Sequence, residues 1–298
     1  MTSSATSLGK RLLPAPVKES ARSGLRVWGR ATASTRPLPD FLIIGTKRGG
    51  TTSLWNYLLE HPGVLPMWPA AENLKSPHYF YWHYDRGLRW YRSHFPTRLS
   101  RSRARRHLGH PVVAGEASPY YLYDPRVPQR VAEVLPGVRL IVLLRNPVER
   151  AFSHYKERVR AGVEELSFEA ALAAEPQRLA GEVETMLERP HHYSRPHDWY
   201  GYRDRGVYHP QLLSWQQCFP ATSMLVLRSE DFYTDPTSTL QEVHRFLQLP
   251  ERPLRNPKRW NYEPAHDMLP ETRTQLERFY RPHNAALVRL LGRDPMWS

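Results

Sequence analysis

A glycine-rich turn that carries two cations has the clearest chemistry in this sequence. The turn is GTKRGG, residues 45–50, and three hydroxyl side chains follow it directly, Thr51, Thr52 and Ser53. Glycines let the backbone approach an anion, and the N–H groups at the start of a helix point toward a bound phosphate. The turn therefore predicts a site for a phosphate-like group. The alternative is an ordinary tight turn with two solvated cations, Lys47 and Arg48.

The spacing of the turn differs from the loop of nucleotide triphosphatases, G-x-x-x-x-G-K-[ST]. Gly45 and Gly50 keep the glycine spacing, but Thr51 stands where that loop has its lysine. That lysine reaches the β- and γ-phosphates of ATP, so the chain favours a different phosphate ligand. A P-loop nucleotide kinase or triphosphatase is the second hypothesis.

A second junction of the same kind follows the apolar run 139–144, where Arg145 stands at the end of a predicted buried strand. Open parallel sheets bind ligands at the carboxyl ends of their strands. Asn146 suits the cap of a helix and Pro147 its first position, so a helix is predicted from there, with Ser153 in its second turn. We therefore expect Arg145 and Ser153 to face a ligand at this edge.

Strands and helices alternate along the chain, which predicts an α/β fold. We expect a P-loop-like, three-layer arrangement with a central, mainly parallel sheet flanked by helices. The expected strands are 41–44, 111–116, 139–144 and 224–227; the expected helices are 51–59, 148–155, 207–219, 239–247 and 271–291, the last broken near Pro282.

The net charge of the 298 residues is +13, which favours anionic partners and makes a nucleic-acid-binding protein a third hypothesis. The basic residues do not gather on one recognisable module, which argues against that class. One cysteine, Cys218, excludes an intramolecular disulfide and a cysteine metal cluster. We expect no metal.

The sequence divides into residues 1–36, a basic and flexible lead, and residues 37–298, one domain. The lead is expected to be a disordered or loosely helical tail, because Pro14, Pro16 and Gly24 interrupt any helix there. The alternative is an amphipathic surface-binding segment or an organelle transit peptide. The cationic stretch 98–110 is expected to be a solvated loop, with a surface for an anionic acceptor as the alternative. No apolar run approaches the roughly 20 residues that span a bilayer, and the N-terminus has no apolar signal-peptide core. A cytoplasmic protein is expected.

The two junctions, GTKRGGTTSL and LIVLLRNPVERAFSHY, together resemble the sulfotransferases that use 3′-phosphoadenosine 5′-phosphosulfate (PAPS). The resemblance extends over residues 39–297 and includes the segments KSPHYF, GEASPYYLY and RGVYHPQLLSWQQCFP. It is strongest to the carbohydrate branch, which includes heparan sulfate sulfotransferases and their bacterial relatives. It implies transfer of a sulfuryl group from PAPS to a hydroxyl or amine of a carbohydrate or glycoconjugate.

The resemblance also implies which residues hold PAPS. The 5′-phosphosulfate would be bound by the first turn and helix start, and the 3′-phosphate by Arg145 and Ser153. The family usually has a lysine immediately before its x-G-T-T, where this chain has Arg48 and places Lys47 one residue earlier. Either Arg48 acts by charge alone, since arginine does not donate its proton, or Lys47 turns inward. The implied residues of the first site are Lys47, Arg48, Gly49, Gly50, Thr51, Thr52 and Ser53.

The catalytic base is the second departure from the family pattern. Heparan-type relatives often have a glutamate before the His-aromatic-Phe segment, where this chain has Ser76 in Lys75-Ser76-Pro77-His78. His78 is the first candidate, since a neutral imidazole accepts a proton near physiological pH. Glu116 is the second candidate and Glu72 the third.

A further donor-binding loop is usual near the C-terminus of the family. The matching segment, residues 254–262, lacks a clear lysine-glycine pair. Arg255 and Lys258 are its candidate donor-binding residues.

Overall fold

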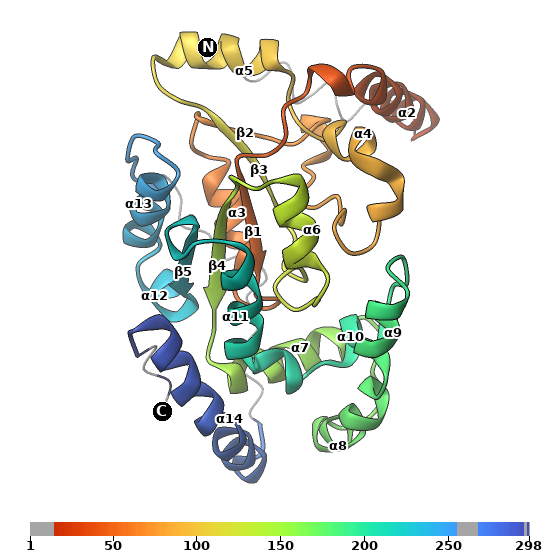
Figure 1. The fold of residues 1–298 in the computed structure, drawn as a ribbon, viewed down its shortest axis with the longest axis vertical. Helices are drawn as coiled ribbons and strands as arrows, with labels where there is room; N and C mark the ends of the chain where they lie inside the picture. The colour runs from red at the N-terminus through yellow and green to blue at the C-terminus, as the bar shows by residue number, and fades with distance from the viewer. Residues whose placement is uncertain (1–14, 255–267, 295–296, 298) are drawn as a thin grey trace.

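A parallel sheet forms the centre of the computed structural model, which describes residues 15–254, 268–294 and 297 (Figure 1). In this part of the chain the sheet has five strands, in the order β2-β3-β1-β4-β5. Each neighbouring pair is parallel, which confirms the predicted α/β fold. The strands are β1 (Phe41–Gly45), β2 (Val64–Leu65), β3 (Val113–Ala117), β4 (Arg139–Leu144) and β5 (Met224–Arg228).

The two central strands carry continuous apolar runs because both faces of the sheet are covered. Phe41 to Ile44 of β1 are completely buried, and so are Leu140 to Leu143 of β4. In the register of the sheet, Phe41 pairs with Gly115 of β3 on one side and with Arg139 of β4 on the other. Because β1 and β4 are parallel neighbours, the turns that leave their carboxyl ends meet at one edge.

The helices cover the sheet and extend beyond both of its ends. In Figure 1, α6 and α11 cross the face turned to the viewer, α7 to α10 gather at one end of the molecule, and α2, α4 and α5 lie at the other. The helices are α2 (Ala15–Ala31), α3 (Thr51–Leu58), α4 (Gly87–Arg92), α5 (Arg98–Leu108), α6 (Val127–Val134), α7 (Pro147–Arg160), α8 (Phe168–Leu179), α9 (Glu182–Glu188), α10 (Arg195–Tyr200), α11 (Tyr208–Cys218), α12 (Ser229–Thr234), α13 (Pro236–Phe246) and α14 (Pro270–Leu291).

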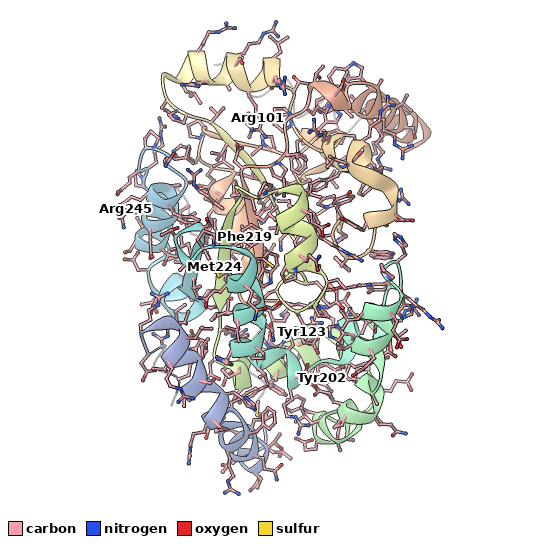
Figure 2. The ribbon with its side chains drawn as sticks, viewed as in Figure 1. Arg101, Tyr123, Tyr202, Phe219, Met224 and Arg245 are labelled. Carbon is pink, nitrogen blue, oxygen red and sulfur yellow. The ribbon has the colours of Figure 1, made fainter. Side chains whose placement is uncertain are left out.

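Buried tyrosines hold the α7–α10 end together and tie it to the segment between β3 and α6 (Figure 2). The hydroxyl of Tyr123 donates to Asp204 at 2.6 Å, and that of Tyr202 donates to Glu164 at 2.9 Å. Each pair joins residues far apart in sequence, so this end is held by polar contacts as well as by apolar packing.

Local signals place α7 where the sequence predicted it. The side chain of Asn146 accepts hydrogen bonds from the N–H groups of Val148 at 2.9 Å and Glu149 at 3.3 Å. Pro147 is the first helical residue, where its missing N–H has no intrahelical partner to lose. The cap therefore fixes where β4 ends and how Arg145 leaves the sheet.

Two predictions about local structure were wrong. The stretch expected to be a solvated loop forms α5, because Thr97 accepts from the N–H of Ser100 at 3.2 Å and Gly109 ends the helix in the left-handed region. The last helix, α14, continues through Pro282. Its buried residues Leu276, Tyr280 and Leu287 hold the turns on both sides of the proline against the core.

Part of the lead also differs from its prediction, because residues 15–31 form α2, through Pro16 and Gly24, and Leu25, Trp28 and Arg36 contact the body. The rings of Trp28 and Trp68 lie 5.0 Å apart, and the indole N–H of Trp68 donates to the carbonyl of Leu25 at 3.1 Å. These are contacts with distant residues, which composition does not reveal. Residues 1–14 lie outside the described part of the chain.

Within the described ranges, the structure has no helix that is both long enough and apolar enough to cross a membrane.

We expect Arg36→Ala to lower the free energy of unfolding by about 2 kcal/mol. Arg36 is completely buried, with its guanidinium carbon 4.7 Å from the ring centroid of Trp28 and 5.0 Å from that of Trp68. It also donates to the hydroxyl of Thr32 at 2.9 Å and to the carbonyl of Phe95. Urea denaturation measures the change. Arg103→Ala, at an exposed position of α5, is the control and should shift stability by no more than about 0.5 kcal/mol; equal losses from both variants would contradict the assignment.

Candidate active site

The turn between β1 and α3 lies directly against the end of β4. The N–H of Thr46 donates to the carbonyl of Leu143 at 2.8 Å, and the N–H of Gly49 donates to the carbonyl of Thr46 at 2.9 Å. A Cβ on Gly49 would lie only 2.8 Å from the carbonyl oxygen of Leu143. Gly50 has a φ of +92° and precedes α3, as the glycine spacing predicted. Glycine is therefore required here by close backbone approach and by conformation.

The two junctions contact each other through Arg48. The Nε of Arg48 donates to the hydroxyl of Ser153 on α7 at 3.0 Å. The guanidinium of Arg145 donates to the backbone carbonyl of Arg48 at 3.2 Å. The structure thus brings Arg48, Arg145 and Ser153 together, as the sequence analysis expected of the two junctions.

Lys47 contacts a different set of residues. Its Nζ lies 3.3 Å from the backbone oxygen of Asp198 on α10 and 3.3 Å from the Oδ1 of that residue. Asp198 also accepts from the hydroxyl of Tyr193 at 2.8 Å and, through its backbone oxygen, from Arg205 at 2.9 Å. Burial lowers the pKa of Lys47 to about 8, although the charge of Asp198 raises it. Sequence reasoning missed Asp198, which lies 151 residues away and follows no recognisable motif.

A third cation lies at the start of α3. The Nζ of Lys75 donates to the hydroxyls of Thr51 at 3.1 Å and Thr52 at 2.9 Å. Burial lowers the pKa of Lys75 to about 8. Sequence reasoning did not assign Lys75 to the anion site; its position beside His78 in the KSPHYF segment was the available signal. Ser53 is buried, with 3% of its surface exposed.

Lys47 and His78 line one pocket, which has a volume of about 360 Å³. Its walls are largely aromatic, and the rings of Trp82 and Tyr193 stack 4.9 Å apart within 7° of parallel. The other lining residues are Tyr81, Pro119, Tyr120, Arg158, Arg195, Asp198 and Trp199.

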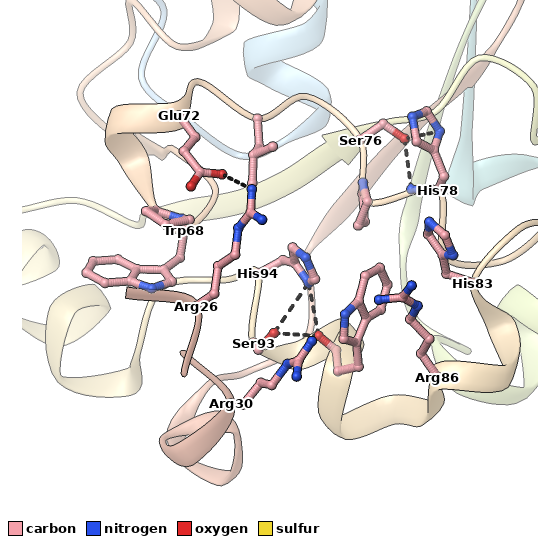
Figure 3. A pocket seen from close by; sticks show the side chains of 14 residues that line it. Arg26, Arg30, Trp68, Glu72, Ser76, His78, His83, Arg86, Ser93 and His94 are labelled. Atoms are coloured by element: carbon pink, nitrogen blue, oxygen red, sulfur yellow. Dashed lines mark hydrogen bonds and ion pairs between the residues drawn. The ribbon is translucent and has the colours of Figure 1, made fainter. Parts of the chain in front are cut away.

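His78 also lines a second pocket, of about 260 Å³, in which Arg26 lies beside Glu72 (Figure 3). The carboxylate of Glu72 pairs with Arg26 at 3.3 Å. Arg30 and Arg86 belong to the same lining. Glu72 is thus placed in an ion pair, whereas His78 lies between the two pockets.

The ring of His78 is held on one side by hydroxyl groups. Its Nδ1 lies 2.9 Å from the hydroxyl of Ser76 and 2.9 Å from that of Tyr81. Burial lowers the pKa of His78 to about 4, with the charge of Asp198 acting in the opposite direction. The imidazole is therefore neutral at physiological pH, as a proton acceptor must be, but its pKa lies well below the near-neutral value that the sequence analysis assumed for a base.

Glu116 is completely buried at the end of β3 and lines neither pocket, so the structure does not place it in direct contact with an acceptor. It accepts hydrogen bonds from the hydroxyls of Tyr91 at 2.6 Å, Ser118 at 2.8 Å and Tyr121 at 3.2 Å. Burial raises its pKa to about 7. Glu116 could therefore take part in proton transfer only through the residues that are hydrogen-bonded to it.

Arg255 and Lys258 lie outside the described residues. Among the residues that are described, no group of three histidine, cysteine or carboxylate side chains is arranged to hold a metal ion.

Comparison with known proteins gives a consistent result. A family model described as "Sulfotransferase domain" matches residues 38–268. The chain is 29% identical to heparan sulfate glucosamine 3-O-sulfotransferase 6 of Mus musculus, over 96% of this chain and 82% of that protein. It is 26% identical to the membrane-associated sulfotransferase kil1 of Dictyostelium discoideum, over 88% of this chain and 67% of that protein. The crystal structure of a sulfotransferase from Alicyclobacillus acidocaldarius is 30% identical, with a TM-score of 0.62, over 87% of this chain and 97% of that one.

We expect Gly49→Ala to destabilise the protein by about 1–3 kcal/mol, because the added methyl group would overlap backbone oxygens that cannot move independently. Gly137→Ala is the matched control, since a Cβ there meets nothing within 4 Å. The control should be neutral or stabilising by a few tenths of a kcal/mol. Thermal unfolding monitored by circular dichroism compares the two. A Gly49→Ala protein as stable as the control would mean that the turn does not lie against β4.

Proposed function

The chain belongs to the sulfotransferase domain family, and on that premise we propose that it transfers a sulfuryl group from PAPS to a hydroxyl or amine of a carbohydrate or glycoconjugate acceptor. The observation that carries this proposal is the contact between the two cation-bearing junctions, Arg48 with Ser153 and Arg145 with the carbonyl of Arg48. Family membership favours this activity over a nucleotide kinase, as does Thr51 in place of the P-loop lysine. Family membership also favours sulfuryl transfer over nucleic-acid binding.

We propose that the two ends of the donor are bound by different cations. Arg145 and Ser153 would bind the 3′-phosphate, one by charge and one by its hydroxyl. The backbone of the turn and the start of α3 would hold the 5′-phosphosulfate, where Lys75 supplies a charge beside Thr51 and Thr52. PAPS has no γ-phosphate, so its binding does not need the P-loop lysine that contacts this group in nucleotide triphosphatases.

Lys47, rather than Arg48, is the residue we assign to the reacting centre. It lines the same pocket as His78, whereas Arg48 is engaged by Ser153 on the donor side. As the acceptor attacks sulfur, negative charge develops on the oxygen that leaves with the adenosine diphosphate. A buried ammonium stabilises this charge and has a pKa suited to donating a proton. His78 takes the proton of the acceptor.

The acceptor class is supported by the pocket walls. Five aromatic residues line the pocket, and an aromatic wall suits contact with the apolar faces of sugar rings; they are Tyr81, Trp82, Tyr120, Tyr193 and Trp199. A mouse relative at 29% identity is a heparan sulfate sulfotransferase. Transfer of radiolabelled sulfate from PAPS to a panel of desulfated glycans tests the activity, and absence of transfer to all of them would contradict the carbohydrate assignment. The cytoplasmic location and the absence of a metal requirement stay predictions.

Arg145→Ala should weaken binding of adenosine 3′,5′-diphosphate about tenfold or more, because it removes a charge-assisted contact to phosphate. Isothermal titration calorimetry measures this without an acceptor. Arg103→Ala, on the exposed surface of α5, should bind as tightly as the wild type. Failure of the wild-type protein itself to bind at high micromolar ligand would count against the donor assignment.

Lys47→Met should lower kcat about a hundredfold or more with a smaller effect on donor affinity, because the lost charge acts mainly in the transition state. The pKa of about 8 sets the pH dependence: the ammonium is present below pH 8 and is lost as the pH rises through it. Turnover of the wild type should therefore fall above pH 8. A rate that stays constant to pH 10 would remove Lys47 from the mechanism.

A further inference from the structure

An unbroken series of hydrogen bonds runs from buried Glu116 to His78. The hydroxyl of Ser118 donates to Oε2 of Glu116 at 2.8 Å. The hydroxyl of Ser118 also contacts that of Ser76, and Ser76 lies 2.9 Å from Nδ1 of His78. Figure 3 shows the last step, in which Ser76 reaches both the ring and the backbone nitrogen of His78.

The carboxylate fixes the direction of every donor in this series. An ionised carboxylate only accepts hydrogen bonds, so the proton of Ser118 points to Glu116. The oxygen of Ser118 then accepts from Ser76, which leaves the oxygen of Ser76 to accept from Nδ1–H of His78 and from its backbone N–H at 3.1 Å. The hydroxyl of Tyr81, 2.9 Å from the same Nδ1, then also accepts from this N–H. A neutral imidazole carries one ring proton, so Nε2 of His78 is left with its lone pair.

We propose that Glu116, Ser118 and Ser76 form a proton relay that holds His78 in the Nδ1–H tautomer and accepts that proton when Nε2 takes the proton of the acceptor. The relay rests on the proposed function, in which His78 is the base. Glu116 is a positioning residue, because it touches no substrate. Ser76 stands where heparan-type relatives often have a glutamate. In this chain, Ser76 would instead connect His78 to the buried carboxylate of Glu116.

The proton and electron pairs balance across the step. The O–H bond of the acceptor breaks and an Nε2–H bond forms on His78, while its Nδ1–H proton passes to Ser76. Ser76 passes its own proton to Ser118, and Ser118 passes its proton to Oε2 of Glu116. The acceptor oxygen forms its bond to sulfur, and the electron pair of the broken sulfur–oxygen bond leaves with adenosine 3′,5′-diphosphate.

The charges around the relay suit this transfer. Tyr91 on α4 and Tyr121 after β3 are the titratable groups that face Glu116, and their hydroxyls partly offset the burial that raises its pKa to about 7. A carboxyl with this pKa is ionised and ready to accept above pH 7, and protonated below it. The charged or titratable groups that face His78 are Lys47, Lys75, His83, Asp198 and Tyr81.

The tautomer of His78 provides a test that needs no acceptor. In protein labelled with nitrogen-15 histidine, the ring shifts at pH 8 should report a proton on Nδ1 of His78, with His78→Gln used to assign the signal. Glu116→Gln should shift this population toward Nε2–H, because the one-directional acceptor is gone. A wild-type His78 that carries its proton on Nε2 would overturn the relay.

Kinetics give a second test, with PAPS and desulfated heparin as the probe acceptor. Ser76→Ala and Ser118→Ala should each lower kcat about tenfold to a hundredfold at unchanged KM for PAPS, while Ser76→Thr, which keeps the hydroxyl, should recover most of the rate. Glu116→Gln should also remove the rise in rate as the pH passes through about 7. Ser102→Ala, exposed on α5, controls for loss of a hydroxyl.

The outcomes separate the two proposals. Wild-type turnover with wild-type rates in Ser76→Ala and Ser118→Ala overturns the relay and leaves the sulfotransferase intact. A wild type that binds no adenosine 3′,5′-diphosphate contradicts the proposed function and, with it, the catalytic role of the relay, while the tautomer measurement still tests the direction of the hydrogen bonds.

Discussion

The parallel pairing of β1 with β4 is the constraint on which the rest of the site depends. It brings together two strand-to-helix turns that are about a hundred residues apart along the chain. The turn after β1 is pressed so close to β4 that a side chain at Gly49 would overlap the backbone. Once the turn is fixed there, Arg48 reaches Ser153 and Arg145 reaches the carbonyl of Arg48. The two turns proposed to bind the ends of the donor thereby lie side by side.

Burial then separates the cations of this site by function. Arginine keeps its charge where it is partly buried, as Arg48 and Arg145 are, which suits both residues to the phosphate contacts proposed for this site. Lysine responds to burial with a lower pKa, which Lys47 and Lys75 both show. A lysine that titrates near neutrality can both stabilise charge and exchange a proton. Lys47 and Arg48 are adjacent in sequence but differ in their ability to exchange a proton. The turn points Lys47 toward Asp198 and Arg48 toward Ser153.

The parts of this arrangement that were predictable from sequence are those with local signals. The apolar runs of β1 and β4 and the Asn146-Pro147 cap lie where the pattern predicted, because each is encoded by neighbouring residues. Asp198 was missed because its contact with Lys47 depends on the docking of α10, which no local pattern encodes. The helix over residues 98–108 was missed because the run of like charges suggested a solvated loop, although Thr97 is a good N-cap and Gly109 suits the C-terminal end. The docking of α2 depends on Trp68 and Phe95, residues that composition alone cannot connect to Arg36.

The buried carboxyl of Glu116 has a consequence for the whole fold. Its pKa of about 7 lies above that of an unfolded glutamate, so between about pH 4.5 and 7 the native chain holds a proton that the unfolded chain has released. By proton linkage, this residue's contribution to stability falls as the pH rises through that window, opposite in sign to the salt-bridged carboxylates that dominate acid unfolding. Glu116 therefore favours the folded state more in mild acid than in alkali.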